Sequence, residues 1–196
     1  MIVNAVVEGS SDIGVAHALI VASGHEVGTE YEKGGKTRLD PDIPKYAMAA
    51  SYGPDRAWLI LRDSDGECPV HLRSSLFGSA DQEPEPDNFL LRIVHTMSEG
   101  WYLGDPEGVA AYFRVPKNKI PHAPEDVSDP KRLLLQLSLK HSPQALRQRF
   151  VRKDVSPGPE FTTMMNDFAR HHWDIRRAAG KVPSLRRALD RLNQLH

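Results

Sequence analysis

The sequence predicts an α/β fold, a largely parallel sheet flanked by helices, with an appended C-terminal helical section. Strand-like and helix-like patterns alternate over the first hundred residues, as in strand–helix–strand units with parallel strands. Short acidic clusters follow two of the hydrophobic runs, and the carboxyl ends of parallel strands form the ligand-binding edge of such sheets. We therefore expect one α/β domain over residues 1–115, followed by a connecting segment and helices over residues 116–196.

Hydrophobic runs mark four strands in the α/β part. The first is expected at Ile2–Val7, and the helix after it is capped by Ser10 or Ser11 and stopped by Gly24. The other three strands are expected at 25–31, 57–62 and 88–95, and two further helices at 41–52 and 69–77. Prolines and acidic residues at 79–87 indicate an exposed loop.

The second half of the chain reads as helical. Pro106 begins a helix, since the missing amide hydrogen of proline costs little at a first helical position. The segment 116–130 contains four prolines and is expected to be a connection. Helical spacing then predicts helices at 133–140, 143–150, 161–179 and 184–195.

The composition is that of an ordinary globular protein. The chain has 196 residues, of which 40% are hydrophobic and 26% charged, so it can bury a sizeable core. No apolar run approaches the roughly 20 residues that a membrane span needs. The first residues lack a signal-peptide pattern, and the single cysteine, Cys68, cannot form an internal disulfide. We expect a cytoplasmic protein without membrane contact.

The net charge of −1 conceals an asymmetry. Residues 1–130 hold 11 Lys and Arg against 21 Asp and Glu, whereas residues 131–196 hold 14 against 5. A basic section beside an acidic metal pocket suits a polyanionic substrate, because cations attract phosphates while carboxylates hold Mg²⁺. Docking of the basic section onto its own acidic domain explains the asymmetry equally well.

The acidic clusters predict a metal site. Glu8 and Asp12 flank the turn after the first strand, and Asp63 and Asp65 follow the strand expected at 57–62. In an extended strand end, residues two apart point the same way, so one hard cation can take both aspartates. Mg²⁺, or Mn²⁺ in its place, prefers carboxylates together with water and substrate phosphate. The plainer alternative is that Asp12 only caps a helix and Asp65 only forms a turn.

The order of these motifs resembles a known family. A strand, Glu8-Gly9-Ser10-Ser11-Asp12, a helix, a strand and Asp63-Ser64-Asp65 are similar to the Toprim domain of topoisomerases, primases and overcoming-lysogenization-defect nucleases. Further segments resemble a Toprim-like family of uncharacterised bacterial proteins. These segments are Met97 to Glu107, Ile120-Pro121, Asp129-Pro130-Lys131 and Pro183 to Arg187.

The resemblance implies roles for individual residues. Glu8 would be a metal ligand or general base, and Asp12, Asp63 and Asp65 would complete the metal site. Glu99 and Asp105 match acidic positions of a third motif, which lies in the segment Met97 to Glu107. Glu99 is therefore a further candidate metal ligand. Trp101 is the aromatic residue of that motif, and we expect it in the core. Basic residues near the motifs, Lys36, Arg38 and Arg73, are candidate phosphate or nucleic-acid contacts.

The family also implies an activity: Mg²⁺-dependent nuclease or phosphodiesterase chemistry on nucleic acid, in phage or plasmid defence, beside a separate ATPase partner. One alternative is a haloacid-dehalogenase-like phosphatase, because Leu59 to Gly66 resembles its strand and Asp-x-Asp-Gly signature. There Asp63 would be the nucleophile and Asp65 the general acid. Another alternative is a non-catalytic partner subunit of an ATPase that binds metal or nucleotide.

Overall fold

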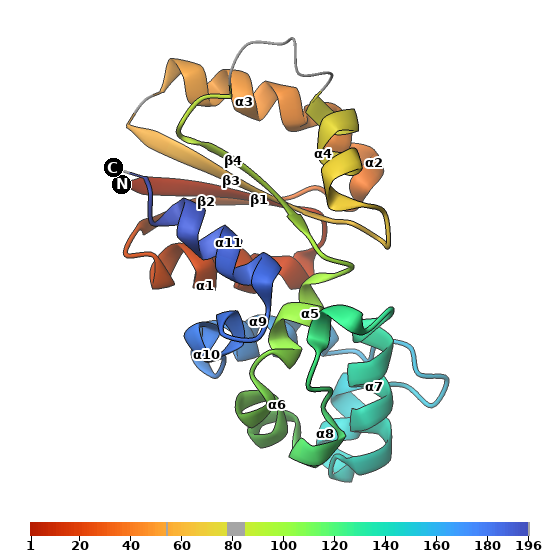
Figure 1. Cartoon of the computed structure of the whole chain (residues 1–196). Helices are drawn as coiled ribbons and strands as arrows, with labels where there is room; N and C mark the ends of the chain where they lie inside the picture. Colours follow the sequence, from red (N-terminus) through yellow and green to blue (C-terminus); the bar gives the residue numbers. More distant parts are fainter. Residues whose placement is uncertain (54, 78–84, 196) are drawn as a thin grey trace.

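A computed structural model describes residues 1–53, 55–77 and 85–195 of the protein. Strands and helices alternate as far as the fourth strand, and the described elements after it are helical (Figure 1). The strands are β1 Ile2–Val7, β2 Glu26–Glu32, β3 Arg56–Asp63 and β4 Phe89–Val94. The helices are α1 Ile13–Ala22, α2 Lys36–Leu39, α3 Ile43–Tyr52, α4 Pro69–Phe77, α5 Ser98–Leu103, α6 Pro106–Phe113, α7 Pro130–His141, α8 Gln144–Phe150, α9 Phe161–His171, α10 Ile175–Ala179 and α11 Pro183–Leu192.

The four strands form one parallel sheet in the order β2-β1-β3-β4. Val7 at the end of β1 lies beside Leu61 of β3, and Asp63 at the end of β3 lies beside Val94 of β4. The loops that follow β1, β3 and β4 therefore leave the sheet at the same edge. This arrangement confirms the predicted α/β class and brings the acidic clusters to one end of the sheet.

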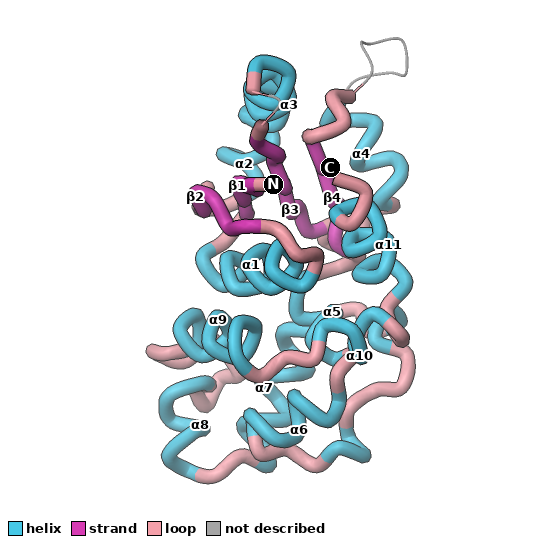
Figure 2. The backbone as a smooth tube through the Cα atoms, turned by 90° about the vertical axis from the view of Figure 1, so that its left-hand side faces the viewer, coloured by secondary structure: helices cyan, strands magenta, loops and turns pink. Residues whose placement is uncertain are grey.

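Helices cover both faces of the sheet (Figures 1 and 2). Side chains alternate along each strand, so Val3, Ala5 and Val7 face α1 while Val6 faces the opposite layer. The smaller core on the opposite face holds Leu39, Ile43, Ala50, Ile60, Phe89 and Leu91. The two layers fix the direction of each strand, and with it the positions of the loops at the sheet edge.

The α1 face of the sheet continues into the helical section. Helix α9 packs on α1, and α11 returns to lie beside α1 and β4 (Figure 2). The same core cluster joins Val15 and Leu19 of α1 to Phe168 of α9 and Leu185 of α11. The last helix thus packs with the sheet, although it begins about ninety residues after β4 in the sequence.

Most predicted elements match the structure within a few residues, but the single helix predicted at 161–179 was wrong. Helix α9 ends at His171 and α10 begins at Ile175. The break is stabilised at Asp174, whose carboxylate caps α10 by accepting from the Arg177 amide and whose own amide donates to the Asp105 carboxylate at 2.8 Å. Most of the predicted loop at 79–87 lies outside the described residues. Among the described helices, none has the length and apolar character that a membrane crossing requires.

Candidate metal centre

Five carboxylates line one cavity of about 250 Å³ at the carboxyl edge of the sheet. They come from the carboxyl ends of three different strands and the segments that follow them. Glu8 and Asp12 follow β1, Asp63 is the last residue of β3, Asp65 lies in the turn after it, and Glu99 lies in α5 after β4. All four residues of the two predicted clusters are therefore brought together with the candidate from the third motif.

Glu8 lies directly after β1, with its carbonyl oxygen accepting a 2.9 Å hydrogen bond from the amide of Gly35. Gly35 has a φ of 117°, a conformation that L side chains rarely adopt, so glycine is required at this approach. The buried Oε2 atom of Glu8 has no hydrogen-bond partner among the residues that the structure describes, and the Arg62 guanidinium lies 3.6 Å away. Burial raises the pKa of Glu8, although the charge of Arg62 opposes the shift.

Asp12 closes a short turn, Ser10–Asp12, that leads into α1. Its side chain accepts a hydrogen bond from Ser98 Oγ at 2.6 Å and another from the Gly9 amide at 3.1 Å. Burial raises the pKa of Asp12, and both hydrogen bonds oppose that shift because they favour the charged form. Asp12 is thus both an organiser of the turn and a carboxylate of the cavity.

Asp63 is the carboxylate whose pKa is shifted by all four of the others. Burial raises its pKa well above the ordinary value of 3.8, and the charges of Asp12, Glu99, Glu8 and Asp65 raise it further. These four residues are the other carboxylates of the cavity. A carboxyl group surrounded by like charges holds its proton unless a cation offsets the repulsion.

Asp65 reaches the cavity differently from the sequence expectation. Strand β3 ends at Asp63, and Asp65 lies in the following turn with a φ of 50°. Its carboxylate accepts from Lys36 Nζ at 2.8 Å and from the Arg62 guanidinium at 3.3 Å. The extended geometry expected from Asp63 through Asp65 is therefore absent, yet both residues line the same cavity.

Glu99 lies in the first turn of α5 and is 3% exposed. Burial raises its pKa to about 7, despite the charge of Lys131, whose Nζ lies 3.7 Å from Glu99 Oε1. Lys131 belongs to the first turn of α7 and lines the cavity with the carboxylates. The sequence carried a signal for it in Asp129-Pro130-Lys131, but no role could be assigned before the packing of α7 was known.

Asp105, the other acidic residue of the third motif, does not join the cavity. Its fully buried carboxylate accepts from the amides of Gly108 and Asp174, and Arg177 lies 3.3 Å away. Asp105 therefore caps α6 and ties it to α10. Trp101 lies in the core as expected, where its indole nitrogen donates to Ser184 Oγ at 2.8 Å.

Sequence reasoning missed Arg62, a charged residue that directly follows the apolar run 57–61 of β3. The Arg62 side chain is 2% exposed and pairs with Asp40, with Nε 2.9 Å from Oδ1 and a terminal nitrogen 3.2 Å from Oδ2. It also donates to the Asp63 carbonyl and lies near Glu8 and Asp65. One guanidinium thus holds together the segments that carry three of the five carboxylates.

The three predicted phosphate contacts occupy different places. Lys36 lies at the cavity, paired with Asp65, and Arg38 is exposed on the same short helix. Arg73 instead lies on α4, where it pairs with Glu85 and lines a different groove. Only Lys36 is therefore placed to meet a phosphate held at the carboxylates.

The chemistry of this cavity suits a hard divalent cation. Within the described part of the chain, no three Asp, Glu, His or Cys side chains lie close enough together to hold one metal ion as they stand. Mutual repulsion favours such spreading of like charges, and a cation would offset it. The unpartnered Glu8 oxygen and the raised pKa of Asp63 are the features that a bound cation would relieve. Oxygen donors of this kind match Mg²⁺ or Mn²⁺.

Comparisons with known proteins return similar solved structures. No family model matches the chain, and no curated protein matches it. The chain is similar to the C-terminal region of the Xanthomonas campestris pv. campestris OLD protein, with 15% identity over 97% of this chain and 91% of that chain and a TM-score of 0.42. A second structure of that region aligns at 16% identity over 97% and 94%, with a TM-score of 0.40. Because both TM-scores lie below 0.5, the proposed function rests on the carboxylate geometry.

Proposed function

We propose that the protein is a divalent-cation-dependent phosphodiesterase that cleaves nucleic acid. The observation that carries this proposal is the convergence of five carboxylates on one cavity, with the pKa of Asp63 raised by burial and by the other four. Such a group of like charges is costly without a cation, and its oxygen ligands are those that Mg²⁺ and Mn²⁺ take beside a substrate phosphate. The motif order that resembles Toprim proteins supports the same activity.

The residues divide into two roles. Asp63, Asp65 and Asp12 would hold one or two cations, with Glu99 as a further ligand, and a bound cation would supply charge neutralisation at the phosphate. Glu8 would orient or deprotonate the attacking water, since its buried Oε2 has no hydrogen-bond partner in residues 1–53, 55–77 and 85–195 and its pKa is raised by burial.

Two lysines supply positive charge near the carboxylates: Lys131 lines the cavity, and Lys36 pairs with Asp65, which lines it. Lys131 lies 3.7 Å from Glu99, and Lys36 lies 2.8 Å from Asp65. Their side chains are 37% and 46% exposed, so each can exchange its carboxylate partner for a phosphate oxygen. A lysine acts there as a point charge that attracts the phosphodiester.

The cellular setting is proposed from the motif resemblance alone. The protein would act beside a separate ATPase partner, in defence against phage or plasmids. A test of this setting is co-purification of a partner with ATPase activity from the native host.

The test of the proposed activity is cleavage of plasmid and single-stranded DNA in Mg²⁺ or Mn²⁺, with Asp63→Asn as the diagnostic variant. This change keeps the shape of the side chain and removes its charge, so we expect cleavage to fall by at least about a thousandfold. Asp126→Asn is the matched control, because Asp126 is exposed on a different segment and should leave cleavage unchanged. Cleavage that persists in Asp63→Asn contradicts the proposal.

The same samples separate the alternative functions. A haloacid-dehalogenase-like phosphatase would release inorganic phosphate from small phosphomonoesters without cutting DNA. A non-catalytic metal- or nucleotide-binding subunit would bind Mn²⁺ in a calorimeter but show neither reaction. Either result would replace the phosphodiesterase proposal.

A further inference from the structure

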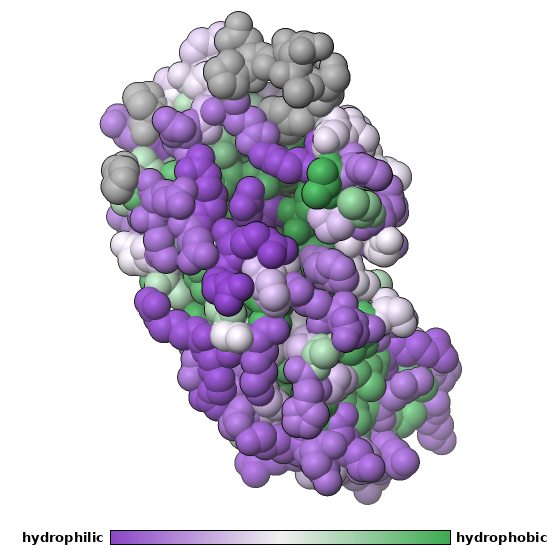
Figure 3. Space-filling model, viewed as in Figure 1, coloured by the Kyte–Doolittle hydropathy of each residue, from purple (hydrophilic) through white to green (hydrophobic). Residues whose placement is uncertain are grey.

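A groove of about 480 Å³ runs along the outer side of β4, and none of its lining residues lines the carboxylate cavity. Strand β4 is the end strand of the described sheet, and the groove lies between α4 and α11, which pack on either side of it. Figure 3 shows hydrophilic surface over α11 and hydrophobic surface between α11 and α4. The groove thus has apolar patches beside a polar rim.

Arginines from three different elements line this groove: Arg73 from α4, Arg92 from β4 and Arg187 from α11. Alternation along β4 places Arg92 on the same face as Leu90 and Val94, the face that α11 covers. We call this site the arginine groove.

The positive charges of the arginine groove are only partly offset. Arg73 pairs with Glu85, and Arg92 donates to the carbonyl oxygen of Leu91 at 2.9 Å. Within the part of the chain that the structure describes, neither Arg92 nor Arg187 has a carboxylate within ion-pair distance. Burial, together with the charges of Arg73, Arg191 and Arg187, lowers the pKa of Arg92 to about 10.

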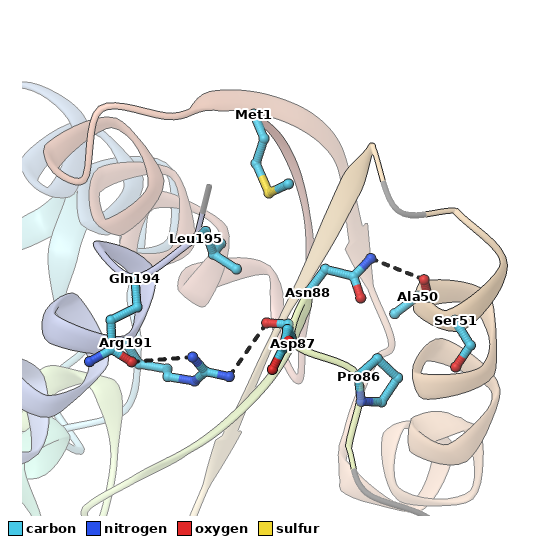
Figure 4. A pocket seen from close by; sticks show the side chains of 9 residues that line it. All are labelled: Met1, Ala50, Ser51, Pro86, Asp87, Asn88, Arg191, Gln194 and Leu195. Atoms are coloured by element: carbon cyan, nitrogen blue, oxygen red, sulfur yellow. Dashed lines mark hydrogen bonds between the residues drawn. The ribbon is translucent and has the colours of Figure 1, made fainter.

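The row of arginines continues along α11 to the other end of β4. Arg191 lies four residues after Arg187 and so on the same side of the helix. Its guanidinium donates to the Asp87 carbonyl at 3.4 Å and to Gln194 at 3.2 Å, at the wall of a second cavity of about 570 Å³ (Figure 4). Arginine side chains therefore lie along β4 from one end of the strand to the other.

We propose that the arginine groove binds the backbone phosphates of a nucleic acid strand. Guanidinium groups bind phosphate through paired hydrogen bonds, and apolar patches between them suit sugars and unstacked bases. An acidic peptide added to the edge of β4 is the competing occupant. The phosphate backbone is favoured because backbone pairing by a peptide needs no charge, whereas three elements contribute arginines here.

This inference deepens the proposed function by naming a place where the substrate is held outside the cavity. Arg92 lies two residues before Val94, which is the neighbour of Asp63 in the sheet. At about 3.3 Å per residue, this separation is only about 7 Å along the strand. The groove therefore begins near the end of the sheet that carries Asp63, and we expect one extended strand of nucleic acid to reach both sites.

The test is binding of a fluorescent single-stranded oligonucleotide, measured by anisotropy in EDTA so that no cation bridges the strand to the carboxylates. Arg187→Glu should weaken binding about tenfold and make the slope of log Kd against log salt shallower by about 0.7, the value for one contact to a single strand. Arg186→Glu is the matched control, because Arg186 is exposed next to Arg187 and does not line the groove. It should shift Kd less than about twofold.

Other outcomes overturn the inference. Equal weakening by Arg187→Glu and Arg186→Glu would show a general charge effect, and an unchanged Kd in Arg187→Glu would show that the groove is not used. Equally tight binding of a labelled polyglutamate peptide, weakened by Arg187→Glu, would assign the groove to an acidic protein partner. The proposed function can fail separately from this inference. Binding that depends on the groove, without cleavage in Mg²⁺ or Mn²⁺, would contradict the proposed activity and support the groove as a binding site. Cleavage together with unchanged binding in Arg187→Glu would support the activity and contradict the groove.

Discussion

The carboxylate cavity and the arginine groove are two clusters of like charge on neighbouring parts of one sheet, but they are built differently. The carboxylates come from loops at the strand ends and are partly or fully buried around Asp63. The arginines come from a strand and two helices and line an open groove, where Arg187 is exposed to solvent.

This difference in burial separates what each cluster can bind. Charges in a buried cluster repel strongly because water cannot screen them, so they need a compact counter-ion within the cavity. Charges along an open groove are screened by salt and can bind an extended polyanion with modest strength per contact. This difference is the physical basis of the two proposals, a cation in the cavity and a phosphate backbone in the groove.

The largest effect on stability is expected at Arg62, the cation that holds the acidic loops in place. Arg62→Met leaves Asp40, Glu8 and Asp65 without this partner, and losing one member of a buried pair costs about 3 to 4 kcal/mol in the free energy of unfolding. Urea denaturation measures the loss. Arg56→Met, an exposed position on the same strand, is the control and should change little. A loss no larger than that of the control would mean that Arg62 does not hold the loops.

Stability in EDTA should fall as pH rises from about 4.5 to about 7. The pKa of Glu99 is raised from 4.5 to about 7, so in this range the folded protein holds a proton that the unfolded chain releases. The proton on Glu99 contributes fully to the free energy of unfolding below the pKa of the unfolded chain. As pH rises to the folded pKa of about 7, the free energy of unfolding falls by on the order of 3 kcal/mol, at about 1.4 kcal/mol per pKa unit. Urea midpoints across this range measure it. Glu99→Gln should flatten the slope, and an unchanged slope would contradict the assignment.

Added cation should reverse that loss near neutral pH. Mg²⁺ or Mn²⁺ at a hundred times its Kd should stabilise the folded protein by about 2.7 kcal/mol. Thermal unfolding with and without EDTA measures the effect. Asp63→Asn should remove most of it, while the exposed control Asp126→Asn should keep it. Equal stabilisation of both variants would place the cation elsewhere.

The smallest effect is expected at the contact between the two regions. Trp101, in the helix that carries Glu99, donates to Ser184, which lines the arginine groove. Ser184→Ala leaves the buried indole hydrogen unpaired and should cost about 1 to 2 kcal/mol, measured by urea denaturation. Ser128→Ala, at an exposed position, should be neutral. If both variants were neutral, the two regions would not be coupled through this hydrogen bond.

Local patterns predicted most of the helices and strands because each pattern depends on residues that are close together in the sequence. Alternating hydrophobic runs, glycine stops and prolines at helix starts act within a few residues. The break between α9 and α10 was missed because it depends on Asp105, which lies about 70 residues before Asp174. A contact of that separation leaves no periodic signal in the sequence.

The sequence by itself determined the α/β order and the acidic residues that end β1 and β3. Only the tertiary structure decided which side chains meet: Glu99 enters the cavity while Asp105 caps a helix, and Lys131 arrives from a helix beyond the connecting segment. It also decided that Arg73 lines the arginine groove instead of the cavity. The physical reason is that the order of residues along the chain fixes strand ends locally, whereas convergence of side chains depends on which strands and helices become neighbours when the core packs.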